Sequence, residues 1–241
     1  MTQTTTLNPK IWLSDDKIHP EVRKNLLQIA KDFIKFVKVK KLKIHDITLT
    51  GSLVDYTWND RSDIDLHVVF NLKNFERHRK FLNEYLQAKK AAWNHSHDVK
   101  MFGYKVELYP QDIDTEQNPR ATYSLVKGTW IQKPVPSDKP QIDKAVVKKK
   151  YQDKVDAILY FEGLIKKSKA DYKKLMFAVE KFQDNITEQR DQALKAEGIH
   201  CVENIVFKLL RNNGFLDRLS NLKKEIYDKA LTIQEKQAKG I

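Results

Sequence analysis

The chain has 241 residues, of which 41% are hydrophobic and 32% charged, so it is expected to fold and is not an intrinsically disordered chain. Lysine and arginine number 44 against 32 acidic residues, and the net charge of +12 favours a polyanionic partner such as a nucleic acid. The sequence lacks an apolar run near the roughly 20 residues that span a bilayer, lacks the apolar core of a signal peptide, and holds a single cysteine, Cys201. We therefore expect a cytoplasmic protein without a membrane partner.

The first half of the sequence alternates predicted helices and strands. In chain order, the predicted elements are a helix at residues 19–42, strands at 46–52 and 62–70, a helix at 73–93, a strand at 104–110 and a hairpin at 122–134. Pro20 suits the first turn of the first helix, and Lys127–Gly128 suits the turn of the hairpin. This order of elements predicts an α+β domain.

The second half of the sequence has a different texture. Three prolines between residues 133 and 140 interrupt both helix and strand, and proline is absent from Ile142 onward. The predicted elements after them are one or two helices at residues 143–182, one helix at 186–214 and one at 216–239. We therefore predict a domain of residues 1–136 followed by a helical bundle of residues 137–241.

Two aspartates stand out on the second predicted strand. Asp63 and Asp65 are two residues apart, so their side chains point to the same face of the sheet. Adjacent carboxylates repel each other unless a cation lies between them, and Mg²⁺ (or Mn²⁺) takes oxygen ligands while keeping positions for substrate phosphates. Glu107 is the candidate third carboxylate if its strand pairs beside the aspartate strand. The alternatives are a solvated strand face and a Glu107 that pairs with Lys105.

Gly51 and Ser52 end the first predicted strand. A glycine lets the backbone approach a phosphate closely, and the amides that open a following helix bind anions. The hydroxyl of Ser52 can donate to the same phosphate. Two metal ions on the carboxylates would then polarise an attacking hydroxyl and stabilise a leaving pyrophosphate.

The Gly-Ser pair, a ten-residue spacing to Ser62 and the run Ser-Asp-Ile-Asp-Leu together resemble the nucleotidyltransferase superfamily of the DNA polymerase β type. The resemblance covers about residues 20–110 and implies a small mixed sheet with helices, an NTP substrate and a divalent metal. The site residues that it implies are Gly51, Ser52 and Ser62 for the nucleotide and Asp63, Asp65 and Glu107 for metal binding and catalysis.

The sequence departs from some relatives. The minimal nucleotidyltransferases of toxin–antitoxin pairs usually place Arg-Gly inside the spacer, where this chain has Asp55 and Tyr56. The third acid is a glutamate, where relatives often have an aspartate. The runs "SDIDLHVVF" and "GYKVELYPQD" are similar to uncharacterised nucleotidyltransferase-like proteins of large bacteriophages, which implies the host cytoplasm as the location.

Several residues near the motif have two interpretations. His67 follows the acidic face and either contacts substrate or has a structural role. Tyr56 and Trp58 either stack on a base or pack a short turn onto the sheet. The segment 94–98, with its two histidines and Asp98, either binds a metal or forms a polar turn. The polar turn is favoured, because the sequence lacks a second pair of metal ligands at the typical spacing.

Lysines are concentrated at the start of the helical domain. Residues 141–174 carry ten lysines and five acidic residues, a local charge of +5 that is either a solvated helix face or a polyanion-binding surface. The leading hypothesis is nucleotidyl transfer from an NTP to an RNA hydroxyl, such as a tRNA 3′ end, with release of pyrophosphate. The alternatives are transfer to a protein or small molecule, synthesis of an oligo- or cyclic nucleotide, and a module of this fold that only binds nucleic acid or protein.

Overall fold

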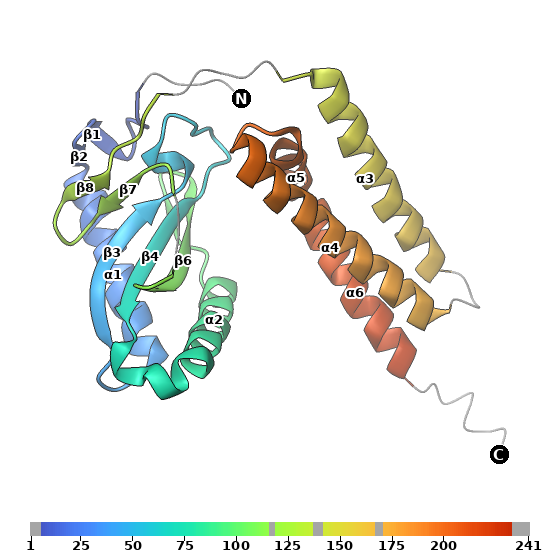
Figure 1. Ribbon diagram of the computed structural model, residues 1–241, viewed down its shortest axis with the longest axis horizontal. Coiled ribbons are helices and arrows are strands. Elements are labelled where there is room, and N and C mark those ends of the chain that lie inside the picture. Colours follow the sequence, from blue (N-terminus) through green and yellow to red (C-terminus); the bar gives the residue numbers. More distant parts are fainter. Residues whose placement is uncertain (1–5, 116–118, 137–141, 167–170, 233–241) are drawn as a thin grey trace. The chain divides into compact units, whose positions relative to one another are not determined.

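The computed structural model describes residues 6–115, 119–136, 142–166 and 171–232. The chain divides into two compact units, residues 1–138 and 139–241 (Figure 1). The first unit combines a mixed sheet with helices, and the second is built from helices alone. The predicted α+β fold followed by C-terminal helices is therefore confirmed.

The first unit holds all the strands of the described chain. Its elements are β1 (Trp12–Ser14), β2 (Lys17–Ile18), α1 (Pro20–Val37), β3 (Lys43–Thr50), the 3₁₀ helix η1 (Ser52–Val54), β4 (Ile64–Asn71), the 3₁₀ helix η2 (Lys73–His78), α2 (Arg79–Ser96), β5 (Lys100–Met101), β6 (Tyr104–Asp112), β7 (Thr122–Ser124) and β8 (Thr129–Gln132). The main sheet has the order β5-β6-β4-β3-β7-β8. β4 and β6 pair in parallel, whereas β3 is antiparallel to both of its neighbours. The predicted pairing of the strand of Glu107 beside the aspartate strand is confirmed.

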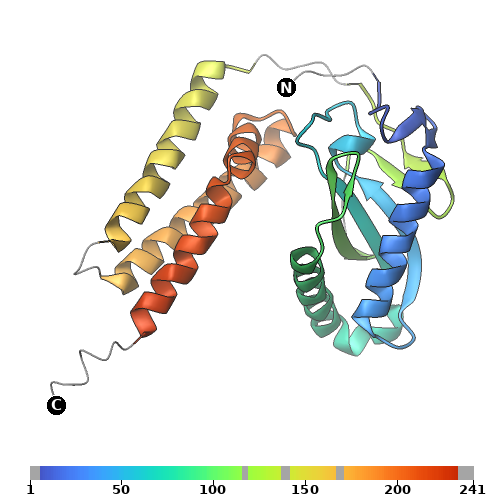
Figure 2. The ribbon, with the colours of Figure 1, turned by 180° about the vertical axis from the view of Figure 1, so that it is seen from behind.

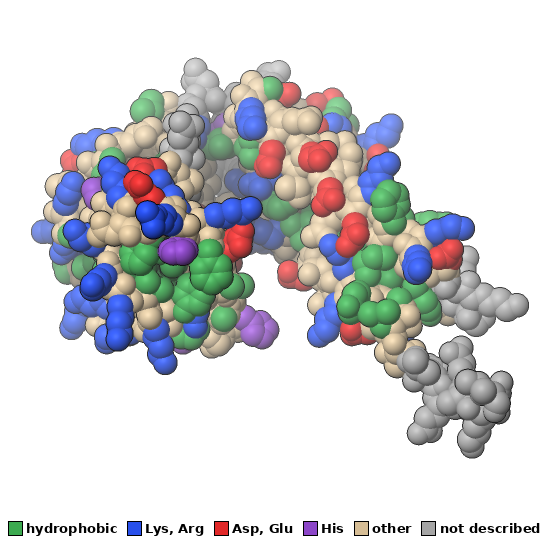
Figure 3. Space-filling view, turned by 60° about the horizontal axis from the view of Figure 1, so that its bottom comes forward, with side chains coloured by type: hydrophobic (Ala, Val, Ile, Leu, Met, Phe, Trp, Pro, Cys, Tyr) green, Lys and Arg blue, Asp and Glu red, His purple; other side chains and the backbone are tan. Residues whose placement is uncertain are grey.

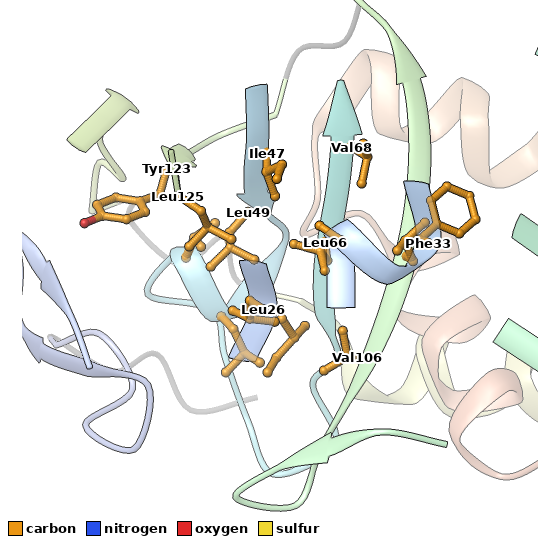
Figure 4. Packing of buried hydrophobic residues seen from close by; sticks show 14 of the residues in the cluster. Leu26, Phe33, Ile47, Leu49, Leu66, Val68, Val106, Tyr123 and Leu125 are labelled. Atoms are coloured by element: carbon orange, nitrogen blue, oxygen red, sulfur yellow. The ribbon is translucent and has the colours of Figure 1, made fainter. Parts of the chain in front are cut away.

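One face of this sheet forms the hydrophobic core. Alternation along β3, β4 and β6 sends their apolar side chains to this face, and Figure 2 shows α1 lying across it. Leu26 and Phe33 of α1 are fully buried there. Figure 4 shows these two side chains beside the strand residues Ile47, Leu49, Leu66, Val68 and Val106. The opposite face of the same strands is therefore free to carry polar side chains.

The N-terminal segment fastens the first unit together. Trp12 stacks on Trp130 of β8 with 4.8 Å between ring centroids, and its indole N–H donates to the carbonyl of Leu53 at 2.8 Å. The buried Asn8 side chain donates to the hydroxyl of Tyr104 at 2.7 Å. These contacts connect residues 8–12 to the edge strand β8, to β6 and to η1, an arrangement that sequence periodicity did not predict.

The second unit consists of four helices among the described residues: α3 (Lys144–Ile165), α4 (Tyr172–Glu197), α5 (Val202–Asn212) and α6 (Phe215–Leu231). Their apolar faces share one core that includes the fully buried Ile158, Val179 and Leu219. The helical prediction is confirmed, but its boundaries were partly wrong. The single helix predicted at residues 186–214 does not exist, because α4 runs through to Glu197 and Gly198 ends it with a φ of 76°.

The last helix and the apolar content of the helices were also predicted from the sequence. The predicted last helix extends to residue 239, and its final part lies outside the described residues. None of the helices in the described ranges is long and apolar enough to cross a membrane.

Replacing a core leucine should destabilise the first unit selectively. Leu66 of β4 is fully buried, so Leu66→Ala should lower the free energy of unfolding by about 2–5 kcal/mol through lost burial and a residual cavity. All four tryptophans, Trp12, Trp58, Trp93 and Trp130, belong to this unit, so tryptophan fluorescence during urea unfolding reports on it alone. The control Val126→Ala, at a side chain 52% exposed, should change the free energy by less than about 0.5 kcal/mol.

Candidate active site

Mostly polar side chains, with Val69 as the apolar member, occupy the second face of the sheet in three rows across β3, β4 and β6. The strand registers define a first row of Thr50, Asp65 and Glu107, a second row of Thr48, His67 and Tyr109, and a third row of Asp46, Val69 and Gln111. Successive rows are about 7 Å apart, since each is two residues further along the strands. Asp65 and Glu107 are therefore direct neighbours on parallel strands, and Asp63 immediately precedes β4 on the same side.

Gly51 makes room for the Asp65 carboxylate. A Cβ atom at Gly51 would lie 1.9 Å from Oδ2 of Asp65, which is far inside the contact distance of any two atoms. The backbone of Gly51 also has a φ of 83°, a conformation that favours glycine. The glycine that the sequence motif assigns to phosphate binding is thus also needed to position the neighbouring aspartate.

Ser52 and Ser62 close the spacer between the two halves of the motif. The hydroxyl of Ser52 donates to the hydroxyl oxygen of Ser62 at 2.8 Å, and that oxygen also accepts from the amide of Asn59 at 3.0 Å. The expected helical turn after Gly51 is the three-residue η1. The two serines therefore hold the glycine turn close to the start of the aspartate strand.

The middle of the spacer is anchored by buried polar contacts. Asp55 is 3% exposed, forms an ion pair with Arg120 at 3.0 Å, and accepts from the amide of Tyr56 at 2.7 Å. The indole N–H of Trp58 donates to the carbonyl of Thr6 at 2.9 Å, and the rings of Tyr56 and Trp58 pack against the core. These contacts support the packing interpretation of both aromatic residues.

Glu107 is held along its own strand. Its carboxylate accepts a hydrogen bond from the hydroxyl of Tyr109 at 2.7 Å and from Lys105 at 3.4 Å. Burial raises the pKa of Tyr109, and the negative charge of Asp65, the hydrogen bond to Glu107 and the charge of Asp63 raise it further. All three acidic residues thus act on one phenol, so they share a single electrostatic environment.

The three acidic residues have the side-chain type that a hard divalent cation prefers, and their backbones are close to one another. Their carboxylates, however, do not converge on one point. All their donors are carboxylate oxygens, which Mg²⁺ prefers. Within the described residues, however, three His, Cys, Asp or Glu side chains do not come close enough together anywhere to hold a metal. A third ligand from Glu107 requires an oxygen of its carboxylate to turn toward Asp65.

The segment 94–98 divides between a helix end and a loop, because residues 94–96 form the last turn of α2. The ring of His97 stacks on Trp93 with 3.9 Å between centroids, and Asp98 pairs with Lys100 at 2.9 Å. The polar-turn prediction is therefore wrong for residues 94–96, and within the described residues the segment is not part of any group of three ligands that could hold a metal.

Lys90 is a candidate site residue that the sequence did not reveal. Its ammonium lies 4.0 Å from the ring centroid of Tyr109. Burial lowers the pKa of Lys90, while the charges of Glu107 and Asp65 act in the opposite direction. The side chain of Asn94, one turn further along α2, bonds the backbone N–H and C=O of Leu108, each at 3.1 Å. Because α2 lies beside β6 (Figure 1), this anchor keeps Lys90 close to the acidic face.

His67 connects the three rows. Its Nε2 lies 3.0 Å from the Thr50 hydroxyl and its Nδ1 lies 3.0 Å from Oε1 of Gln111. An amide oxygen only accepts, so Nδ1 carries the proton and the Thr50 hydroxyl donates to Nε2. Burial lowers the pKa of His67, an effect that Gln111 opposes and the charge of Lys90 reinforces. His67 is therefore a neutral bridge that orients Thr50 in the first row.

Comparison with known proteins identifies a domain around this site. Residues 30–131 match the family model of the nucleotidyltransferase domain, a segment that covers less than half of the chain and contains every candidate site residue from Gly51 to Glu107. This match supports the nucleotidyltransferase superfamily and an NTP as substrate. Searches of curated proteins and of solved structures found no match.

Adding one methyl group at Gly51 should disable the site while leaving the fold intact. In Gly51→Ala the new Cβ displaces the Asp65 carboxylate, so the affinity for Mn²⁺, measured by electron paramagnetic resonance, should fall by about 10-fold or more. Gly128→Ala is the matched control, because it shares a positive φ of 71° but meets only ordinary contacts with Arg23. Equal Mn²⁺ affinity in the two variants would contradict the role given to Gly51.

Removing the charge of Lys90 should strengthen metal binding in the absence of nucleotide. Lys90→Met removes a positive charge near Asp65 and Glu107, and the Mn²⁺ affinity should rise about 5-fold, which corresponds to about 1 kcal/mol. Lys89→Met is the control, because the Lys89 ammonium lies instead over the rings of Phe36 and Tyr85. A gain in Mn²⁺ affinity of the same size in both variants would show that Lys90 acts on the acidic residues no more than Lys89 does.

Proposed function

We propose that the protein is a metal-dependent nucleotidyltransferase that moves a nucleoside monophosphate from an NTP to a hydroxyl group of RNA. The observation that carries the proposal is the direct pairing of Asp65 with Glu107 across β4 and β6, with Asp65 packed against Gly51. This pairing supplies adjacent carboxylates beside a turn that suits phosphates.

Each part of the site has a role in this reaction. Gly51 binds the triphosphate through close backbone approach, and the Ser52 hydroxyl turns from Ser62 to donate to a phosphate oxygen. Asp63, Asp65 and Glu107 would hold Mg²⁺ or Mn²⁺, and the bound metal would polarise the attacking hydroxyl and neutralise phosphate charge. The acceptor oxygen bonds to the α-phosphorus, the bond to the bridging oxygen breaks, and pyrophosphate leaves. The proton of the acceptor hydroxyl passes to a carboxylate of the site.

Basic surface supports RNA as the acceptor. Of the lysines that the sequence concentrates on α3, Lys150 pairs with Glu203 and Lys154 lies over Phe182. Lys144, Lys148 and Lys149 are exposed to solvent. Figure 3 also shows lysine and arginine side chains spread over the N-terminal unit, at the left of that view. Such surfaces bind polyanions by releasing counterions, and an RNA 3′ end, including that of a tRNA, is the proposed acceptor.

The proposal predicts label transfer that depends on the two aspartates. The full-length protein is incubated with each α-labelled NTP, Mg²⁺ or Mn²⁺, and total RNA, and label on RNA is measured. Asp63→Asn and Asp65→Asn should each reduce transfer by about 100-fold or more, because each removes a charged ligand. Asp60→Asn, at an exposed acid of the same spacer, is the control and should keep full activity.

Other outcomes decide between the alternatives. Label on protein or on a small molecule would replace RNA as the acceptor, and labelled short or cyclic products would identify the NTP itself as the acceptor. Absence of transfer to any acceptor, together with unchanged RNA binding in Asp63→Asn, would favour a module that binds RNA without turnover.

A further inference from the structure

A hollow of about 380 Å³ opens on the same face of the sheet as the acidic residues. Its floor includes Thr48 and Thr50 of β3 and Gln111 of β6, and its wall includes Thr122 of β7 and Gln132 of β8. A hollow of this volume lies within the size range of ligand pockets. The hollow is therefore large enough for a small organic group and lies entirely in the first unit.

The hollow extends along the rows away from the proposed triphosphate site. It begins at Thr50, the Cα partner of Asp65, and continues through Thr48 to Asp46 and His45. Gly51 and Ser52 lie in the other direction along the chain, just beyond Thr50. In-line attack needs the acceptor and the leaving pyrophosphate on opposite sides of the α-phosphorus. The hollow and the turn at Gly51 and Ser52 thus lie on opposite sides of Thr50 along the chain.

The lining favours a ring with hydrogen-bonding edges, and Lys127 adds a positive charge to it. Gln111 and Gln132 offer amides that both donate and accept, while Val69 and Ile131, the latter 58% exposed, offer apolar surface. Asp46 is the acidic residue among those lining the hollow, but it is buried. Its Oδ1 already accepts from the amide of Ile47 at 2.7 Å and the hydroxyl of Ser124 at 2.9 Å. A polycationic acceptor would therefore find little to pair with.

We propose that this hollow binds the terminal nucleoside of the acceptor strand, with the base against the amides of Gln111 and Gln132 and the ribose directed toward Thr50. Amide side chains and apolar surface recognise the edges and faces of unpaired bases in this way. A nucleoside on the second and third rows would direct its ribose hydroxyl toward the first row, which carries Asp65. The inference rests on the proposed function, because it assigns the acceptor of that reaction.

The experiment measures the binding of free ribonucleosides, which lack phosphate, to the full-length protein. The donor site is first filled with Mg²⁺ and a non-hydrolysable α,β-methylene NTP, and each of the four nucleosides is then titrated by saturation-transfer NMR. At least one nucleoside should bind, and Thr122→Phe, which fills the hollow, should weaken that binding about 10-fold or more. Thr129→Phe is the control, because this exposed threonine of the same hairpin does not line the hollow.

A second variant tests the hollow in case Thr122→Phe does not fold. Gln132→Trp changes an exposed residue of the edge strand β8 and should also obstruct the hollow. Nucleoside binding that is equal in Thr122→Phe, Gln132→Trp and the unmodified protein would overturn the proposal, as would loss of nucleoside binding when the analogue is added. Saturable binding of the polycation spermidine that Thr122→Phe abolishes would also overturn it.

The two proposals can fail separately. If the analogue does not bind in a Mg²⁺-dependent way and Asp65→Asn has no effect on it, the proposed function is contradicted. Nucleoside binding that Thr122→Phe still abolishes would then support the hollow as a nucleoside site in its own right.

Discussion

Two acidic residues are neighbours on adjacent parallel strands, and the proposed site depends on how the repulsion between their carboxylates is balanced. Asp65 and Glu107 are partners in the ladder between β4 and β6, so the fold fixes their backbone positions. Tyr109 and Lys105 bond the Glu107 carboxylate, and Lys90 adds a positive charge nearby. A divalent cation would relieve the same repulsion more strongly, because it can bind oxygens of both residues directly.

The proposed site is supported by the spacer between Ser52 and Ser62 and by the N-terminal segment, neither of which carries a proposed metal ligand. The bridge from Ser52 to Ser62 joins the glycine turn to the aspartate strand, and the ion pair of Asp55 with Arg120 anchors the spacer between them. Trp12 connects the same region to the N-terminal segment through Leu53. A catalytic constellation needs such supporting contacts, because small displacements of its groups reduce rates greatly. The unusual spacer therefore acts as a support for the motif at its two ends.

The sequence predicted what depends on local pattern. Alternation in β4 and β6 placed Asp65, His67 and Glu107 on the polar side of their strands, and the low glycine and proline content after residue 141 predicted helices. It did not predict the end of α4 at Gly198, although the glycine is followed by the weak helix formers Ile199, His200 and Cys201, because periodicity alone does not locate a single break.

Contacts between distant segments also lay beyond the sequence. The proximity of Lys90 to Tyr109 depends on how α2 lies beside β6, and the hollow depends on the pairing of β7 with β3. Neither of these two contacts between distant segments produces a periodic pattern in the sequence. One clue to Lys90 was present, since Gln87, Lys90 and Asn94 share one side of a helix, and the two amide side chains bond the β6 backbone at Pro110 and Leu108.

The most direct test is the anomalous scattering of Mn²⁺ in a crystal of the protein grown with a non-hydrolysable NTP analogue. We predict a Mn²⁺ peak with carboxylate oxygens of Asp65 and Glu107 at about 2.1 Å, the distance typical of octahedral oxygen sites. Mn²⁺ bound elsewhere, or bound without a carboxylate oxygen of Glu107, would contradict the assignment of Glu107 as the third ligand.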